Sequence, residues 1–332
     1  MTQAAPLFAD QAEGPPDGRA FWLRTADGVQ IRAAIWGTGQ KGTVLLFPGR
    51  TEYIEKYGRA AADLHARGFT TLVVDWRGQG LAARAHADRL IGHVGHFDEY
   101  QRDVDAILAL AEAEGLPRPF HLLCHSMGGC IGLRSLMRGL PFASACFSAP
   151  MWGISMAAWS RPLAHVLGRL APVFGQAHRY APGTGGQTYV LATGFQGNVL
   201  TTDLEMWEYM RRQVAAHPDL ALGGPSLGWL GAALQECGAL AALPSPATPA
   251  ITALGTAEKV VDVAPIHLRM AGWRNGRLDL YAGAEHEVPM ETRAHRTRFY
   301  DEAAKLFRAQ ALARTAALQS YSEIWLNPSR NA

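Results

Sequence analysis

A serine in a tight-turn motif is the strongest chemical signal in this sequence. Residues 120–129 read FHLLCHSMGG, so an apolar run leads into Ser126, with Cys124 two residues before it and Gly128 two residues after it. A strand, a small-x-Ser-x-Gly turn and a helix in this order predict a strained turn that exposes the serine hydroxyl. Small neighbours are needed because other backbone passes close to such a turn. Ser126 is therefore the candidate nucleophile, and the alternative is a serine in an ordinary structural turn.

A serine hydroxyl is a weak nucleophile near neutral pH, so a base must activate it. Of the 12 histidines, His286 alone follows a late apolar run, in the segment LDLYAGAEH at residues 278–286. A loop after that run would lie at the carboxyl edge of a parallel sheet, the same edge as Ser126. His286 is thus the candidate base, whereas His125 adjoins the serine and is expected to point elsewhere and pack.

The base in turn needs an acid that fixes its tautomer and stabilises the imidazolium. Glu258 lies four residues past the apolar run 249–254, on the loop between a predicted strand and a predicted helix. Asp262 is the rival, but it can instead cap the following helix. We therefore favour Glu258 as the acidic partner of His286.

Acyl-transfer chemistry also needs hydrogen-bond donors for the developing oxyanion. Residues 44–50 read VLLFPGR, which predicts a buried strand that enters a glycine turn at the same carboxyl edge. The backbone N–H groups of Arg50 and Met127 are the candidate donors. A Pro-Gly pair alone is equally typical of a structural turn, so this assignment depends on Ser126.

The elements that must position these residues follow an alternating pattern of buried strands and helices. The best helical pattern covers residues 98–114, and Asp98 can cap its start, with Gln101 in the position of a capping box. Such alternation predicts a mainly parallel sheet with helices on both faces. The predicted strands are 44–47, 70–76, 120–124, 143–148, 250–254 and 278–282, after a hairpin of 21–25 and 29–36; further helices are expected at 55–66 and 291–313.

The alternation stops near residue 151 and resumes near residue 246. The segment between is mostly helical in pattern, rich in glycine, and contains Trp152, Trp159, Trp207 and Trp229. This pattern predicts an inserted helical cap. The predicted organisation is a flexible N-terminal segment (1–18), a core (19–150 and 246–315), a helical cap (151–245) and a C-terminal tail (316–332).

Composition and charge exclude several classes of function. The net charge is +2, with 31 basic and 29 acidic residues, so no electrostatic case exists for nucleic-acid binding. The uncharged stretch 139–160 is long enough to span a bilayer, but Pro150 would break a helix there, and we expect a buried strand followed by a loop. His93 and His96 are spaced like a metal pair, but no Cys, Asp or His cluster joins them, so we expect neither a metal nor a cofactor.

The start of the chain and the cysteines predict a cytoplasmic protein. The N-terminus lacks the basic and apolar regions of a secretory signal. No cysteine pair has the C-x-x-C spacing, and buried free thiols are the expectation. The four cysteines are Cys124, Cys130, Cys146 and Cys237.

Four motifs together resemble the monoacylglycerol lipase and bacterial lysophospholipase branch of the α/β-hydrolases. They are the oxyanion loop FPGRTEYIEKY at 47–57, the turn DWRGQG at 75–80, the elbow HSMGG at 125–129 and the histidine loop GAEH at 283–286. The order serine, acid, histidine also matches that fold. Three residues depart from the usual pattern, namely Pro48 for His, Cys124 for Gly, and Glu258 for Asp.

The resemblance implies an α/β-hydrolase fold and hydrolysis of a monoacyl lipid or a similar ester, without a cofactor. An apolar cap suits an acyl chain and is a candidate for transient contact with a membrane surface, although its apolar residues could equally form plain core. Arg50, Arg211 and Arg212 are candidates to meet a phosphate head group, or are solvated surface arginines. The rival functions are acyl transfer, aminopeptidase activity on the same scaffold, and non-catalytic binding.

Overall fold

A computed structural model describes residues 3–157 and 159–326, with side chains up to residue 311. Within these residues the chain forms a single sheet whose strands occur at all the positions expected from the apolar runs, with one further strand at the N-terminus. The strands are β1 (Gln3–Ala5), β2 (Arg19–Arg24), β3 (Gln30–Gln40), β4 (Thr43–Phe47), β5 (Phe69–Asp75), β6 (Phe120–His125), β7 (Phe142–Ser148), β8 (Ala250–Gly255) and β9 (Gly276–Tyr281).

The sheet is mixed at one end and parallel over the rest of its width. The strand order is β1-β2-β3-β5-β4-β6-β7-β8-β9. β1, β2 and β3 pair antiparallel, as do β3 and β5, whereas every pair from β5 to β9 is parallel. The predicted mainly parallel sheet is confirmed, and the carboxyl ends of β4, β6, β8 and β9 share one edge.

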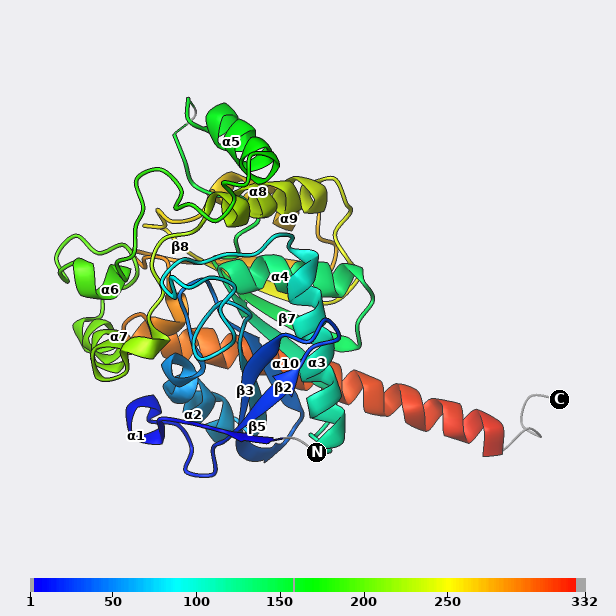
Figure 1. Cartoon of the computed structure of the whole chain (residues 1–332). Coiled ribbons are helices and arrows are strands. Elements are labelled where there is room, and N and C mark those ends of the chain that lie inside the picture. Colours follow the sequence, from blue (N-terminus) through cyan, green and yellow to red (C-terminus); the bar gives the residue numbers. More distant parts are fainter. Residues whose placement is uncertain (1–2, 158, 327–332) are drawn as a thin grey trace.

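Helices cover both faces of the sheet (Figure 1). In β4, Leu45 and Phe47 pack with α3 and α4, whereas Val44 and Leu46 pack with α2 and α10 on the opposite face. This alternation follows from the two-residue period of a strand. The helices are α1 (Ala9–Ala12), η1 (Ile54–Tyr57), α2 (Gly58–Ala66), α3 (Asp98–Ala113), α4 (Met127–Met137), α5 (Arg161–Val173), α6 (Tyr189–Ala192), α7 (Leu204–Ala216), η2 (Pro218–Leu220), α8 (Leu227–Ala241), α9 (Val263–Ala271), η3 (Val288–Met290) and α10 (Arg293–Leu326).

The segment between β7 and β8 contains the helices α5 to α8, as the sequence pattern predicts. α5 lies on α8, and α8 packs against α4 of the core; in Figure 1, α5 is the uppermost helix. α7 instead packs beside η1 and α1, where the Tyr209 hydroxyl donates to the carbonyl oxygens of Ala12 and Glu55. The helices α7 and α8 of the insert therefore pack on separate parts of the core.

The N-terminal segment differs from the flexible segment expected for residues 1–18. β1 pairs with β2, and α1 follows it. The Arg32 guanidinium donates to the Pro6 carbonyl at 3.0 Å, and Asp17 accepts from the Gly37 N–H at 3.0 Å. Leu7, Phe8 and Ala12 also pack on the apolar clusters of the core. These contacts and the backbone pairing leave no periodic pattern in the sequence.

Two smaller expectations were also wrong. Asp98 is the first residue of α3 rather than its N-cap, and Phe97 holds the cap position without a side-chain bond. Gln101 does not complete a capping box, because its amide donates to the Ile131 carbonyl in the core at 3.0 Å. The last helix, α10, extends to Leu326, well beyond the expected end at residue 313 and through part of the expected C-terminal tail.

The uncharged stretch 139–160 forms β7 followed by a loop, as expected. Among the described residues, no helix combines the length and apolar character needed to cross a bilayer. All four cysteines are buried and free, which agrees with the expectation of reduced thiols.

Candidate active site

Ser126 occupies the one-residue turn between β6 and α4. Its φ of 49° and ψ of −118° are sterically unfavourable for a residue with a side chain. Two backbone hydrogen bonds hold this conformation, from the Ser126 N–H to the Ser148 carbonyl at 3.0 Å and from the Met151 N–H to the Ser126 carbonyl at 2.9 Å. The neighbouring strand β7 and the loop after it thus fix the turn.

Small residues around the turn are required by close contacts. A Cβ atom at Gly128 would lie 2.0 Å from the Phe47 carbonyl oxygen, so only glycine fits. Cys124 stands where the family pattern has glycine, and Gly132 makes room for it, since a Cβ there would lie 2.4 Å from the Cys124 sulfur. The larger side chain of Cys124 is therefore accommodated by Gly132, which lies on α4 one helical turn after Gly128.

His286 and Glu258 meet through a direct hydrogen bond. His286 Nδ1 lies 2.7 Å from Glu258 Oε2, and both side chains are almost fully buried. Glu258 Oε1 accepts from the N–H groups of Val260 at 2.6 Å and Val261 at 3.0 Å. A carboxylate with these partners accepts the Nδ1 proton, which leaves Nε2 of the ring as the basic nitrogen.

The charge of Glu258 is stabilised by the same contacts. Burial acts to raise the pKa of this carboxyl, but the hydrogen bond and charge of His286 outweigh it and the pKa is lowered. The rival acid, Asp262, has a different role in the structure. It caps α9 by accepting from the Ala264 N–H at 3.1 Å, and it pairs with Arg161 at 3.0 Å.

Ser126 and His286 line one cavity of about 500 Å³ between the strand ends and the insert. No hydrogen bond to Ser126 Oγ occurs among the described residues, so the hydroxyl faces the cavity unpaired. Catalytic hydrogen bonds are often long before substrate binds and tighten in the complex. The structure thus brings the candidate nucleophile and base, 160 residues apart in the chain by their numbers, to a common surface.

In the loop after β4, the backbone N–H of Arg50 has no acceptor among the described residues, whereas the N–H groups of its two neighbours are hydrogen-bonded. The Gly49 N–H bonds to the Glu52 carboxylate, and the Thr51 N–H bonds to Gln79 Oε1 at 3.1 Å. Gln79 also donates to the Gly49 carbonyl at 3.0 Å. Among the described residues, no acceptor pairs with the N–H of Arg50 or of Met127, so both remain free to bind an oxyanion.

The chain is similar to known proteins in sequence and in fold. The family model described as serine aminopeptidase, S33, matches residues 38–293, a span that includes both turns and all three candidate catalytic residues. Lysophospholipase L2 of Escherichia coli K12 is 34% identical over 274 residues, which cover 76% of each chain. The chain belongs to the serine aminopeptidase S33 family of α/β-hydrolases.

Two further similarities agree with membership of this family. Probable lysophospholipase L2 of Haemophilus influenzae is 29% identical over 254 residues, covering 75% of this chain and 78% of the relative. A soluble variant of monoglyceride lipase from Saccharomyces cerevisiae has the same fold, with a TM-score of 0.67 at 18% identity, covering 87% of this chain and 95% of that structure. The resemblance inferred from the four motifs is confirmed.

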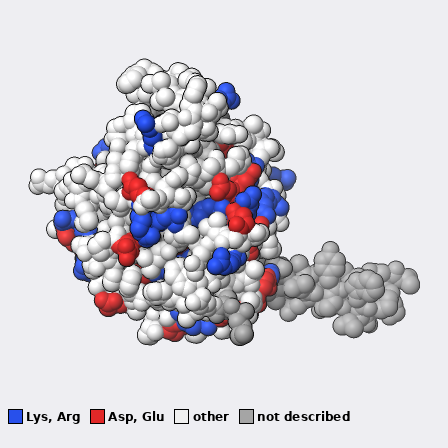
Figure 2. All heavy atoms as spheres, viewed as in Figure 1, with Lys and Arg blue, Asp and Glu red and all other residues white. Residues whose placement is uncertain are grey.

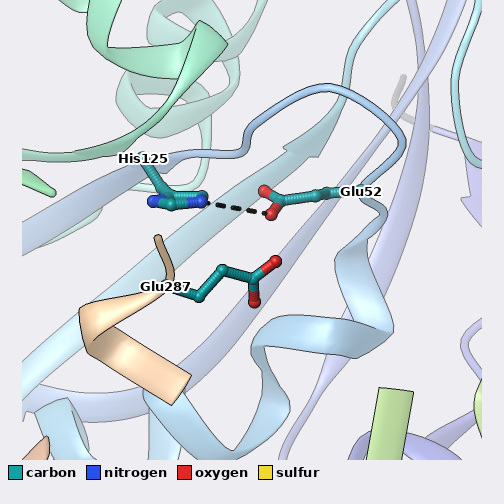
Figure 3. A group of neighbouring side chains, drawn as sticks. All are labelled: Glu52, His125 and Glu287. Atoms are coloured by element: carbon teal, nitrogen blue, oxygen red, sulfur yellow. Dashed lines mark ion pairs between the residues drawn. The ribbon is translucent and has the colours of Figure 1, made fainter. Parts of the chain in front are cut away.

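In this α/β-hydrolase the buried residues Glu52, His125 and Glu287 form a cluster (Figure 3) that belongs to the lining of the same cavity. Lys56 Nζ lies 2.6 Å from Glu52 Oε1 and 2.8 Å from Glu287 Oε2, so one ammonium bridges two carboxylates. The His125 ring faces Glu52, with Nε2 at 3.6 Å from Oε1, and its Nδ1 lies 3.2 Å from the Ser148 carbonyl. Burial lowers the pKa of His125 to about 3, so this ring is neutral. His125 thus packs rather than acting as the base.

The cluster links the oxyanion loop to the histidine loop. Glu52 holds the Gly49 N–H on one side, and Glu287 directly follows His286 on the other. Backbone bonds from His286 to the Val199 carbonyl at 3.3 Å and from Glu287 to the Leu200 carbonyl at 2.8 Å attach the histidine loop to the insert. Lys56 therefore connects the two loops whose relative position the chemistry requires.

The position of Lys56 argues against a metal ion in the cluster. The ligand atoms of Glu52, His125 and Glu287 lie close enough together to suit one. However, the Lys56 ammonium already lies between the two carboxylates, where a cation would bind. Of the two histidines with metal-like spacing, His93 Nδ1 lies 2.8 Å from the Ser226 hydroxyl, whereas His96 Nδ1 lies near Asp98 on the surface.

The three arginines considered as phosphate ligands occupy different environments. Arg211 pairs with Glu208 at 3.0 Å, and Arg212 pairs with Glu13, both at the surface of α7. Arg50 alone of the three lines the cavity. Sequence reasoning did not find Glu52, Lys56 or Glu287; the four-residue spacing of Glu52 and Lys56 was a signal of pairing, but not of burial.

Proposed function

We propose that the protein is a serine hydrolase that cleaves carboxylic esters of lipid-like substrates, a lysophospholipid or a monoacylglycerol, through an acyl-enzyme. The single observation that carries this proposal is the His286–Glu258 hydrogen bond beside a cavity that Ser126 enters from a strained turn. Lysophospholipase L2 of E. coli, at 34% identity, supports the choice of substrate class.

In this mechanism, His286 Nε2 removes the proton from Ser126 as its oxygen attacks the ester carbonyl. The N–H groups of Arg50 and Met127 stabilise the tetrahedral anion, and each such donor contributes roughly 10²–10³ in rate. His286 then returns the proton to the leaving alcohol. Water hydrolyses the acyl-enzyme by the same route, with Glu258 holding the imidazolium throughout.

The lining of the cavity favours an acyl chain. Burial of each methylene in such a lining stabilises the complex by about 0.8 kcal/mol. Most of the lining side chains are apolar, and they come from the insert as well as from the core. The apolar residues that line the cavity are Tyr53, Met151, Ile154, Tyr189, Val190, Val199, Leu200, Met210, Val214, Pro225, Trp229, Val260 and Val261.

The family description raises aminopeptidase activity as a second candidate. Such an enzyme must neutralise the α-ammonium group of its substrate, usually with a free carboxylate. The carboxylates that line this cavity, Glu52 and Glu287, already share Lys56. Ester hydrolysis is therefore the better supported reaction, and acyl transfer would differ only in the nucleophile that accepts the acyl group.

Labelling with a fluorophosphonate tests the proposal directly. The wild-type protein should form one covalent adduct, which Ser126→Ala abolishes while its thermal unfolding stays within a few degrees of wild type. Turnover of monoacylglycerol, lysophosphatidylcholine, p-nitrophenyl esters and amino-acid arylamides then separates the reactions. Labelling that persists in Ser126→Ala, or turnover of arylamides alone, would contradict the assignment.

We also propose that the insert contacts a lipid surface. The compartment that we propose for the protein is the cytoplasm. α5 is the uppermost helix in Figure 1, and the corresponding part of Figure 2 carries few charged residues. The exposed apolar side chains of this helix and its C-cap are Leu163, Val166, Leu170, Val173 and Phe174. An amphipathic helix of this kind binds a bilayer interface by burying its apolar face.

A further inference from the structure

The Arg50 side chain is a half-buried cation without an anionic partner among the described residues. Its Nη2 donates to the Gly223 carbonyl of the insert, and its guanidinium lies 5.4 Å from the centre of the Trp229 ring. Its Nε is inaccessible to solvent and has no hydrogen-bond partner. Among the described residues, no carboxylate forms an ion pair with it, although most other buried arginines of the core have one or more.

Arg32 provides the contrast within the same protein. Its guanidinium binds Glu55 at 2.7 Å and Asp75 at 2.7 Å, so its charge is fully compensated. For Arg50, burial lowers the pKa to about 10, and the groups that partly oppose this are the Tyr100 and Tyr180 phenols rather than acids. The side chain still carries its charge at neutral pH. A buried charge without a partner is unfavourable, so an anion that entered the cavity would be bound.

An incomplete set of partners is not by itself evidence of a binding site. Arg84 is also half-buried, and its Nε and Nη1 lack hydrogen-bond partners. Arg84, however, donates to the Gly80 carbonyl at 2.8 Å and does not line the cavity. What distinguishes Arg50 is that it belongs to the lining of the cavity that contains Ser126.

The position of Arg50 fixes the spacing between two parts of a ligand. Its backbone N–H is the candidate donor to the ester carbonyl oxygen, and its guanidinium lies at the end of the same side chain. In a lysophospholipid, a glycerol unit separates the ester carbonyl from the phosphate. Both spans contain about six covalent bonds, or roughly 6–8 Å when extended. One residue can therefore contact both groups of the same molecule.

We propose that the Arg50 guanidinium is a phosphate-binding subsite that selects lysophospholipids over uncharged monoacylglycerols. This inference rests on the proposed ester hydrolysis at Ser126 and names the feature that sets its head-group preference. Arginine binds phosphate through charge-assisted hydrogen bonds, and Nη1 of Arg50, for which no hydrogen-bond partner occurs among the described residues, is the donor for such a contact.

The surroundings of the subsite agree with an anionic ligand. The guanidinium packs closely against Gly92, since a Cβ there would lie 3.0 Å from Arg50 Nη2. The cavity carboxylates Glu52 and Glu287 share Lys56, which reduces their repulsion of a phosphate. Lys259, which is mostly exposed and pairs with Glu285 at 3.4 Å, is a third cation of the lining beside Arg50 and Lys56.

The test compares two esters that differ in the head group alone, 1-decanoyl lysophosphatidylcholine and 1-decanoylglycerol. The measured quantity is the ratio of their kcat/KM values, in which any loss common to both substrates cancels. Arg50→Gln should reduce this ratio by about 10- to 100-fold, the loss of one or two hydrogen bonds to a charged group. Arg50→Lys, which keeps the charge without the planar fork, should give an intermediate ratio.

Two variants serve as controls. Arg84→Gln removes a comparably buried guanidinium outside the cavity and should leave the ratio within about twofold of wild type. Gly92→Ala displaces the Arg50 guanidinium without removing its charge and should lower the ratio. A ratio that is unchanged in Arg50→Gln, or equally reduced in Arg84→Gln, would overturn the subsite.

A further arm separates a lipid phosphate from free phosphate. sn-Glycerol 3-phosphate should inhibit hydrolysis of p-nitrophenyl butyrate by the wild-type protein and not by Arg50→Gln. If inorganic phosphate inhibits equally well while the substrate ratio does not depend on Arg50, the site binds free phosphate and the inference is wrong. If wild type hydrolyses neither ester and no fluorophosphonate adduct forms at Ser126, the proposed function itself fails.

Discussion

The cavity has two walls that are built in different ways. The core wall consists of strand ends and the loops after them, where buried charges are paired and backbone groups lie in close contact. The opposite wall comes from the insert, whose contribution is mostly apolar side chains on short helices and loops. Above it, α5 exposes much of its apolar surface, whereas the helices on the core bury theirs.

This difference separates chemistry from substrate fit. On the core wall, a shift of about 1 Å would break a hydrogen bond such as His286–Glu258, because hydrogen bonds have narrow distance ranges. Apolar contacts on the insert wall are non-directional and tolerate changes of side chain. We therefore expect substitutions in the core wall to produce the largest losses, and those in the insert to change substrate use.

The largest effect should come from Glu258. Glu258→Gln keeps the size of the side chain but removes the charge that holds His286 Nδ1–H, so kcat should fall by about 10³–10⁴-fold. Asp262→Asn on the same loop is the matched control, because Asp262 caps α9 and should affect kcat less than about threefold. Steady-state kinetics with p-nitrophenyl butyrate measures both. Equal losses in the two variants would show that the acid has been misassigned.

The next largest effect should be a loss of stability in Lys56→Met. The change leaves Glu52 and Glu287 buried without their shared cation and should reduce the free energy of unfolding by about 3–5 kcal/mol. Adding Glu287→Gln removes one of the two charges and should restore part of the loss. Urea denaturation of the three proteins measures this.

The control for Lys56 is Lys305→Met, because Lys305 is exposed and pairs with Glu302 at the surface. That change should alter the free energy of unfolding by less than about 0.5 kcal/mol. If Lys56→Met were no more harmful than Lys305→Met, the bridge between the oxyanion loop and the histidine loop would have no structural importance.

The sequence predicted the positions of the candidate catalytic residues, but it did not predict contacts between segments that are distant in the chain. The candidate residues Ser126, Glu258 and His286 each follow an apolar run, so local spacing was enough to place them at one edge of the sheet. β1 has only three residues and left no periodic signal. The burial of Lys56 and of the Arg50 side chain depends on segments distant in the chain, which no local pattern records. The contacts of the insert were not predictable for the same reason.

A smaller effect concerns the pH dependence of the core. Burial lowers the pKa of His121 to about 3, against about 6.5 in an unfolded chain. The unfolded state therefore binds one more proton between these values, so stability is complete above pH 6.5 and falls as the pH falls. The slope from one such histidine is about 1.4 kcal/mol per pH unit.

Replacement of His121 should reduce that slope. His121→Gln removes the titrating ring but keeps a polar group near the Ser144 hydroxyl, which lies 2.8 Å from His121 Nδ1. Urea denaturation at pH 8, 6.5, 5.5 and 5 should show a shallower loss of stability for the variant by about 1.4 kcal/mol per unit below pH 6.5. Parallel curves for the two proteins would mean that His121 is protonated in the fold.

The smallest effect should come from the exposed face of α5. Leu163 and Val166 are each 51% exposed and make little contribution to the core, so Leu163→Ser with Val166→Ser should leave stability and p-nitrophenyl butyrate hydrolysis within about twofold of wild type. Hydrolysis of a long-chain ester presented in phosphatidylglycerol vesicles should fall several-fold, because less apolar area remains to enter the bilayer interface. Leu280→Thr, which changes a leucine of similar exposure on β9, controls for the loss of surface apolar area. Since the proposed catalytic residues lie on the core wall, an equal loss on soluble and vesicle-bound substrates would show that α5 supports the cavity itself, and the division between the two walls would no longer hold.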